Sequence, residues 1–100
     1  MAYYDRDGRP LADIMEYARL FADKSYQIIE QTDVDEDVRV STVWLGIDHN
    51  FFGEGPPLIF ETMIFGGNHD EYQWRWATED EARFAHEKIV LNLTAGKDPF

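Results

Sequence analysis

Residues 38–48 read Val-Arg-Val-Ser-Thr-Val-Trp-Leu-Gly-Ile-Asp, and residues 58–65 read Leu-Ile-Phe-Glu-Thr-Met-Ile-Phe. Both stretches are rich in β-branched and aromatic residues, which favour strands. Residues 50–57 between them hold two glycines and two prolines, a composition typical of a loop. Because short connections join antiparallel neighbours, we expect the two stretches to pair as the central strands of an antiparallel sheet.

Two shorter strands are expected, one before and one after this pair. Residues 26–32 have a strand-forming composition, and the acidic run over residues 33–37 follows them as a hairpin loop. Residues 72–77 alternate aromatic and polar side chains, the period-2 pattern of a strand with one wet face. The acidic run has the opening spacing of a calcium-binding loop, but Val38 and Trp44 occupy the positions that need glycine and glutamate. We therefore interpret it as a solvated turn.

Helices are expected on both sides of the strands. Residues 11–23 carry apolar side chains at helical spacing. The expected buried stripe of this helix is Leu11, Ile14, Ala18 and Phe21. A second helix is expected to begin after Thr78, because Thr78 and Glu81 have the spacing of a capping box. Its expected buried side chains are Ala82, Ala85, Ile89 and Leu93, with Phe84 and Leu91 flanking them.

This order of elements predicts an α+β fold. We expect an antiparallel sheet of three to four strands with an N-terminal and a C-terminal helix, arranged in two layers. Both helices are expected to share one face of the sheet, while a small open barrel and helices on opposite faces remain alternatives. No linker, repeat or low-complexity tract interrupts the sequence, so residues 1–100 are expected to form a single domain.

The composition excludes several classes of function. Acidic residues outnumber basic ones by 20 to 9, and the net charge of −11 disfavours direct binding to nucleic acid or to an anionic membrane. The chain has no cysteine, which excludes disulfides and thiol nucleophiles. No apolar run is long enough to span a bilayer, and the N-terminus has no signal-peptide pattern. We therefore expect an intracellular protein with no membrane partner.

The residues that could carry catalysis or hold a metal form no recognised pattern. Neither Ser25 nor Ser41 lies in a nucleophile elbow, and no glycine-rich phosphate loop is present. His49 and His69 follow the two central strands and could converge there with a carboxylate, but their spacing matches no compact metal-ligand motif. We therefore expect a protein that is not an enzyme and that has no metal or cofactor.

Glu61 interrupts an otherwise apolar strand. It is expected either to pair with Arg39 or Arg75 on a neighbouring strand, or to face a groove that takes a ligand. Because both central strands look apolar on both sides, helices on one face cannot cover all of this surface. We therefore expect the second face to be buried in a homodimer or by a partner. The residues expected on that face are Thr42, Trp44, Ile59, Glu61, Met63 and Phe65.

Residues 41–49 and 57–67, with residues 4–8 and 78–86, resemble a family of small proteins encoded by bacteriophages and prophages. The resemblance brings no established activity with it. It implies a phage accessory protein that acts in the cytoplasm of the bacterial host. Since small acidic phage proteins often bind host machinery, the expected partner is a host protein, and counter-defence inhibition is one such role. The alternative that the sequence leaves open is a protein that sequesters a nucleotide-like signal by aromatic stacking. The residues expected to form the binding face are Thr42, Trp44, His49, Glu61, Met63, Trp74 and Arg75.

Overall fold

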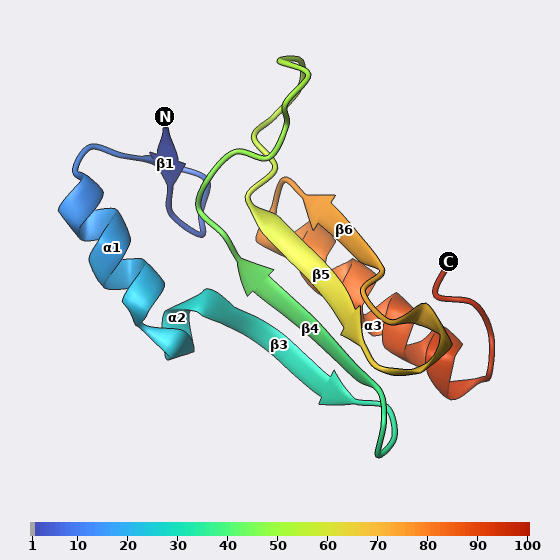
Figure 1. Cartoon of the computed structure of the whole chain (residues 1–100). Coiled ribbons are helices and arrows are strands. Elements are labelled where there is room, and N and C mark those ends of the chain that lie inside the picture. Colours follow the sequence, from blue (N-terminus) through green and yellow to red (C-terminus); the bar gives the residue numbers. More distant parts are fainter. Residues whose placement is uncertain (1) are drawn as a thin grey trace.

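The two apolar stretches form the central strands of a four-stranded antiparallel sheet (Figure 1). The computed structural model describes residues 2–100. Trp44 lies opposite Phe60, and Val40 lies opposite Ile64. The strand order is β3-β4-β5-β6, with bounds Ile28–Asp33, Arg39–Trp44, Phe60–Phe65 and Gln73–Trp76. The short 3-10 helix η1 (Gly67–His69) lies in the connection between β5 and β6.

The long helix α3 (Glu79–Thr94) covers one face of this sheet (Figure 1). It begins where the sequence predicts, because the Thr78 hydroxyl oxygen accepts a hydrogen bond from the backbone N–H of Glu81 at 3.2 Å. Its buried residues are Ala82, Ala85, His86 and Ile89, and it contacts all four strands. The predicted α+β fold, an antiparallel sheet with helices on its N-terminal and C-terminal sides, is confirmed.

The N-terminal arm forms a small hairpin instead of the first helical turn. β1 (Tyr3–Tyr4) pairs with β2 (Pro10–Leu11), so the prediction that a helix begins at residue 11 is wrong. Asp5 stabilises the turn, because its carboxylate accepts hydrogen bonds at 2.9 Å from the backbone N–H groups of Asp7 and Arg9. These local bonds hold Pro10 in an extended conformation that a helix cannot continue from.

The first helix, α1 (Ile14–Ala22), starts after Asp13 and lies beyond the end of β4 (Figure 1). The short helix α2 (Lys24–Gln27) links it to β3. α1 reaches the sheet through Tyr17, whose ring packs 5.7 Å from that of Trp44. α1 and α3 therefore contact the same apolar cluster around Trp44, α1 through Tyr17 and Leu20 at the end of the sheet and α3 through Ala82. No residue of α1 is buried, and Ile14, expected in a buried stripe, is exposed.

The register of β4 and β5 corrects the predicted second face. Thr42 lies opposite Thr62, while Glu61 lies opposite Val43, so Thr42 and Glu61 point to opposite faces. The core face carries Val40, Thr42, Trp44, Phe60, Thr62 and Ile64, all fully buried. The open face carries Ser41, Val43, Glu61, Met63 and Phe65. The expectation that Thr42, Trp44 and Ile59 share a face with Glu61, Met63 and Phe65 is wrong; Ile59 packs in the core beside Trp44.

The core under α3 has two apolar parts with a polar centre between them. One part gathers around Trp44 and includes Ile29, Ile59, Phe60 and Ala82. The other part consists of Val40, Ile64 and Ile89. Between them lie the buried side chains of Thr42, Thr62 and His86.

Candidate functional site

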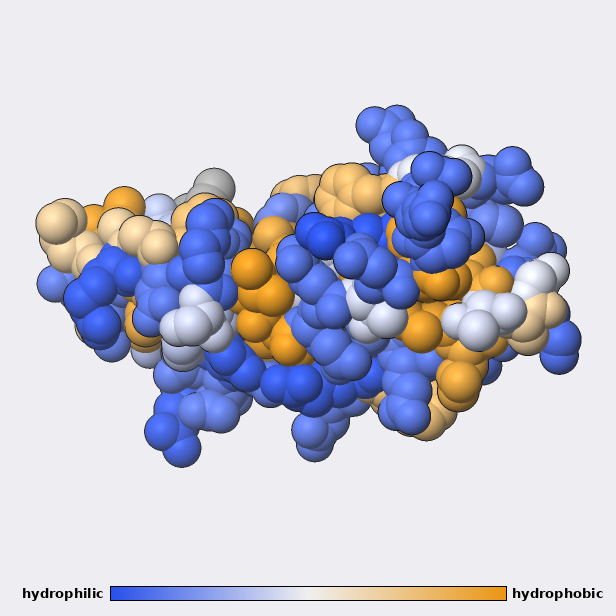
Figure 2. Space-filling model, turned by 90° about the horizontal axis from the view of Figure 1, so that it is seen from below, coloured by the Kyte–Doolittle hydropathy of each residue, from blue (hydrophilic) through white to orange (hydrophobic). Residues whose placement is uncertain are grey.

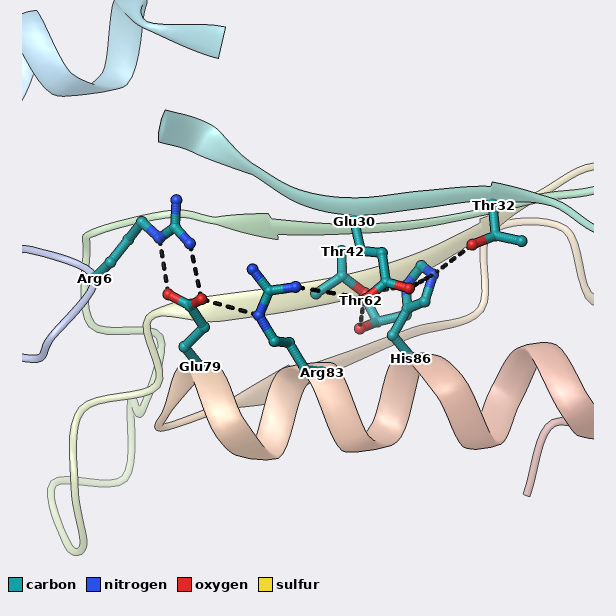
Figure 3. A network of polar contacts seen from close by, with 8 residues as sticks. All are labelled: Arg6, Glu30, Thr32, Thr42, Thr62, Glu79, Arg83 and His86. Atoms are coloured by element: carbon teal, nitrogen blue, oxygen red, sulfur yellow. Dashed lines mark hydrogen bonds and ion pairs between the residues drawn. The ribbon is translucent and has the colours of Figure 1, made fainter. Parts of the chain in front are cut away.

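The polar centre of the core is built around His86, which points from α3 into the sheet (Figure 3). The His86 Nδ1 atom lies 2.7 Å from the Thr42 hydroxyl, and its Nε2 atom lies 2.9 Å from the Thr32 hydroxyl. The Thr42 hydroxyl lies 2.7 Å from that of Thr62, which accepts a hydrogen bond from the indole N–H of Trp76 at 3.0 Å. Four hydrogen bonds thus tie α3 to β3, β4, β5 and β6.

One direction of proton donation satisfies every group in this chain. The Trp76 indole can only donate, so Thr62 accepts from it and donates its own proton to Thr42. Thr42 then donates to Nδ1 of His86, and the Nε2–H of His86 donates to Thr32. In the reverse direction the Thr62 hydroxyl proton finds no acceptor among its contacts in residues 2–100. The geometry therefore assigns the Nε2–H tautomer to His86.

Burial keeps this histidine neutral. Desolvation lowers the pKa of His86, and the nearby cation of Arg83 lowers it further, while the Glu30 carboxylate, 3.7 Å from Nε2, acts in the opposite direction. The side chains of His86, Thr42 and Thr62 are fully buried. No substrate could reach them without opening the core, so we assign the network to the stability of the fold.

An outer chain of ion pairs links the same helix to the N-terminal arm (Figure 3). Arg83 lies 3.7 Å from Glu30 and 3.0 Å from Glu79. Glu79 also takes two hydrogen bonds of 2.8 Å from the guanidinium of Arg6. The bidentate contact with Arg6 is the main reason that the pKa of Glu79 is lowered. This chain fastens residues near the start of the sequence to the first turn of α3.

The residues expected to form the binding face are divided among four places. Thr42 and Trp44 are fully buried in the core, so they cannot contact a partner directly. Trp74 is half-buried on the α3 side of β6, under Phe100. His49 lies in the loop after β4, where its Nδ1 atom is 2.8 Å from the carbonyl of Ile47. The structure brings together only the remaining three, Glu61, Met63 and Arg75, on the open face.

Glu61 is paired across the strands, as one of the two interpretations of the sequence expected. Its carboxylate lies 3.1 Å from the guanidinium of Arg75, its direct register partner on β6. Arg39 pairs with Asp33 at 2.7 Å instead. The open face is therefore a mixture of ion pairs and half-buried apolar side chains, which an antiparallel sheet can leave in water. It does not by itself require a partner.

The residues considered for a metal site do not converge. His49 follows β4 and His69 follows β5, and neighbouring antiparallel strands finish at opposite ends of the sheet. His69 instead lies 3.3 Å from Asp98. Within residues 2–100, no three side chains of His, Asp or Glu gather in a way that could hold a metal ion. The stacking pocket expected for a nucleotide does not assemble either, because Trp44 is buried in the core and Trp74 packs on the opposite side of the sheet from the Glu61–Arg75 pair.

Exposed and half-buried apolar side chains gather at the edge of the sheet beside β6, and we call this surface the aromatic patch. Its members are Tyr72, Trp74, Trp76, Phe84, Leu91 and Phe100. The ring of Phe100 lies 5.3 Å from that of Trp74 and 6.3 Å from that of Trp76. Lys88 lies over the same ring at 5.5 Å. A shallow hollow of about 230 Å³ lies between Trp76, Phe84, Lys88 and Phe100.

The aromatic patch exists because α3 does not fully cover the edge strand. The segment after α3 folds back over β6 and is held by a 2.7 Å hydrogen bond from the Asn92 amide to the carbonyl of Pro99. Phe84 and Leu91, expected beside the buried stripe, are mostly exposed. Their spacing with Lys88 places all three on one side of the helix, a signal present in the sequence. Phe100 reaches the patch only because the segment after α3 folds back over β6, and no pattern in the sequence predicts that path.

Three other places expose apolar side chains, and one of them is Phe65 on the open face, which is 48% exposed. On α1, Ile14 and Met15 are 59% and 70% exposed. In the loop between β4 and β5, Phe51 and Phe52 are almost completely exposed at the tip. Figure 2 shows that hydrophobic atoms reach the surface in separate patches between hydrophilic ones, including at the end of the molecule where α1 lies.

These observations define a class: an acidic α+β protein with a closed polar core and several exposed apolar surfaces. No family model, no curated protein and no solved structure matches the chain. No helix within residues 2–100 has both the length and the apolar character needed to cross a membrane.

Proposed function

We propose that this protein acts by binding another protein, without a catalytic step of its own, and that the exposed face of α1 makes the contact. The observation that carries the proposal is that α1 is an apolar helix with no buried residue. An apolar helix at the surface of a folded chain is usually one side of an interface.

The apolar arc of α1 is wider than the rest of the protein covers. Tyr17, Leu20 and Phe21 turn toward the body, where Tyr17 and Phe21 pack on the ring of Trp44. Successive helical residues are rotated by about 100°, so Ile14, Met15, Ala18 and Ala22 lie together on the side turned away. All four are exposed. An amphipathic helix of this kind fits into an apolar groove on a partner.

The charge of the protein indicates the chemistry around that groove. The net charge is −11, and α1 with its two capping residues holds Asp13, Glu16 and Asp23 against a single base, Arg19. A groove bordered by basic residues would attract this end of the molecule and raise the association rate. The resemblance to phage proteins supports a host protein in the bacterial cytoplasm as the partner, with inhibition of a host defence protein as one such role.

The test compares three forms of the protein as bait in lysate from bacterial cells. Met15→Glu places a charge in the exposed apolar face of α1. Asn68→Asp adds the same charge at an exposed position on η1 and serves as the matched control. We expect one host protein to bind the wild type and the control, and its affinity for Met15→Glu to fall at least tenfold, since burying a methionine contributes about 1.5–3 kcal/mol.

Salt dependence provides a second measurement on the purified pair. We expect the affinity to fall as salt rises, because steering by opposite charges is screened. The proposal fails if the wild type binds no host protein, or if Met15→Glu binds the same protein as tightly as the control does.

A further inference from the structure

We propose that the aromatic patch is a contact between two copies of this chain, related by a two-fold axis beside β6. This surface is separate from the face of α1 used in the proposed function. The inference rests on the size of the patch, its distribution of charge and its position next to an unpaired strand edge.

The patch is large enough to contribute most of a stable interface. Tyr72, Phe84, Leu91 and Phe100 are 51%, 72%, 63% and 55% exposed. With about 200 Å² for each side chain, they leave about 500 Å² of surface in water. A specific interface buries about 800 Å² on each partner. The half-buried rings of Trp74 and Trp76 and the adjoining edge of β6 supply further area.

The edge of the sheet beside the patch is open to pairing. β6 has β5 on one side and no strand on the other within residues 2–100. An edge strand presents unpaired backbone N–H and C=O groups that a second strand can satisfy. If β6 pairs antiparallel with β6 of a second copy, two four-stranded sheets join into one. The sides of the two α3 helices that carry Phe84, Lys88 and Leu91 then face each other across the axis.

The charges of the patch favour a second copy over a basic partner. Two copies with a net charge of −11 each repel one another, so self-association needs a surface where this repulsion is weak. The hollow in the patch is lined by one base, Lys88, and one acid, Glu81. In a two-fold contact the same surface meets itself, so Lys88 of each copy can face Glu81 of the other. A partner with a strongly basic surface would gain little from such a balanced patch.

The test measures the mass of the protein by sedimentation at increasing concentration and salt. We expect a dimer whose affinity rises several-fold between 0.05 and 0.5 M salt (about 14 and 4 Å of screening length), because salt screens the repulsion between the two acidic copies. We expect Phe84→Glu to weaken the dimer at least tenfold. Met15→Glu, which adds the same charge at a residue of equal exposure on α1, should leave it unchanged.

The lack of cysteine in the chain permits a direct measurement of proximity. Leu91→Cys is expected to form a covalently cross-linked dimer on mild oxidation, and Met15→Cys is expected to form little cross-linked product although it still dimerises. The inference is overturned if the wild type remains a monomer at every concentration and salt. It is also overturned if Phe84→Glu dimerises as tightly as the wild type. The same holds if Met15→Glu weakens the dimer as much as Phe84→Glu does, or if Met15→Cys cross-links as efficiently as Leu91→Cys. Loss of host-protein binding by Met15→Glu with an intact dimer separates this inference from the proposed function.

Discussion

Replacing Thr42 by valine removes one hydroxyl from the middle of the buried polar network and keeps the shape of the side chain. The Thr42 hydroxyl donates to Nδ1 of His86 and accepts from Thr62. In Thr42→Val, an acceptor on His86 and a donor on Thr62 are both left without a partner in a region closed to water. Each buried group left unsatisfied costs about 1–3 kcal/mol. With two such groups, we therefore expect the free energy of unfolding to fall by about 2–6 kcal/mol.

The assay is equilibrium unfolding in urea, followed by tryptophan fluorescence. Thr32→Val is the matched control, because Thr32 is only partly buried and makes a single hydrogen bond with His86, so we expect a loss of about 1 kcal/mol. Removing the unpaired groups as well should recover stability, so Thr42→Val combined with His86→Leu and Thr62→Val is expected to be less destabilised than the sum of the single changes. A loss below 0.5 kcal/mol for Thr42→Val, or strict additivity in the triple variant, would refute this account of the network.

Two further predictions concern protonation and backbone geometry. Because the pKa of His86 is lowered in the folded state, the unfolded chain takes up a proton first as the pH falls below about 6.5, and the free energy of unfolding should decrease by up to about 1.4 kcal/mol per pH unit until the folded pKa is reached. An NMR titration should place the midpoint of the His86 ring below 6.5, and a midpoint at or above that value contradicts the prediction. Gly46 has a φ of +75°, and a Cβ there would lie 2.6 Å from the Trp44 ring, so Gly46→Ala should cost about 2–4 kcal/mol. Gly8→Ala, with a similar φ of +82° and open space around it, should cost about 1 kcal/mol, and equal losses in urea unfolding would show that the ring contact is unimportant.

The sequence predicts the elements of the sheet well because their signals are local. The composition of residues 38–48 and 58–65, and the capping spacing of Thr78 and Glu81, each depend on neighbouring residues alone. The pairing between strands is not local. Alternation shows that Thr42 and Trp44 share a face, but nothing within β4 or β5 fixes which residue of one strand lies opposite which residue of the other. Because the sequence does not fix the register between β4 and β5, the prediction placed Thr42 and Trp44 on the same face as Glu61, which is wrong.

For a helix, the local pattern likewise does not fix which side packs against the rest of the fold. α1 has apolar residues around more than half of its circumference, so its pattern cannot say which side packs. The structure turns Tyr17 and Leu20 inward and leaves Ile14 outside, because Gly46 gives the Tyr17 ring room to approach Trp44. His86 lies one turn after Ala82 on the buried side of α3, which the sequence could have shown. Its hydroxyl partners on two strands, Thr32 and Thr42, depend on the folded sheet and could not be inferred.

The order of elements along the chain has a consequence for how the protein is made. All four strands precede α3, the helix that shelters their apolar face. As the polypeptide leaves the ribosome, Trp44, Phe60 and Ile64 emerge well before the residues that will lie over them. Until then the apolar face of the nascent sheet is exposed to chaperones and to neighbouring nascent chains. The sheet can therefore be covered only after α3 has been synthesised. A chain stalled on the ribosome before residue 79 would keep the apolar face of its sheet exposed.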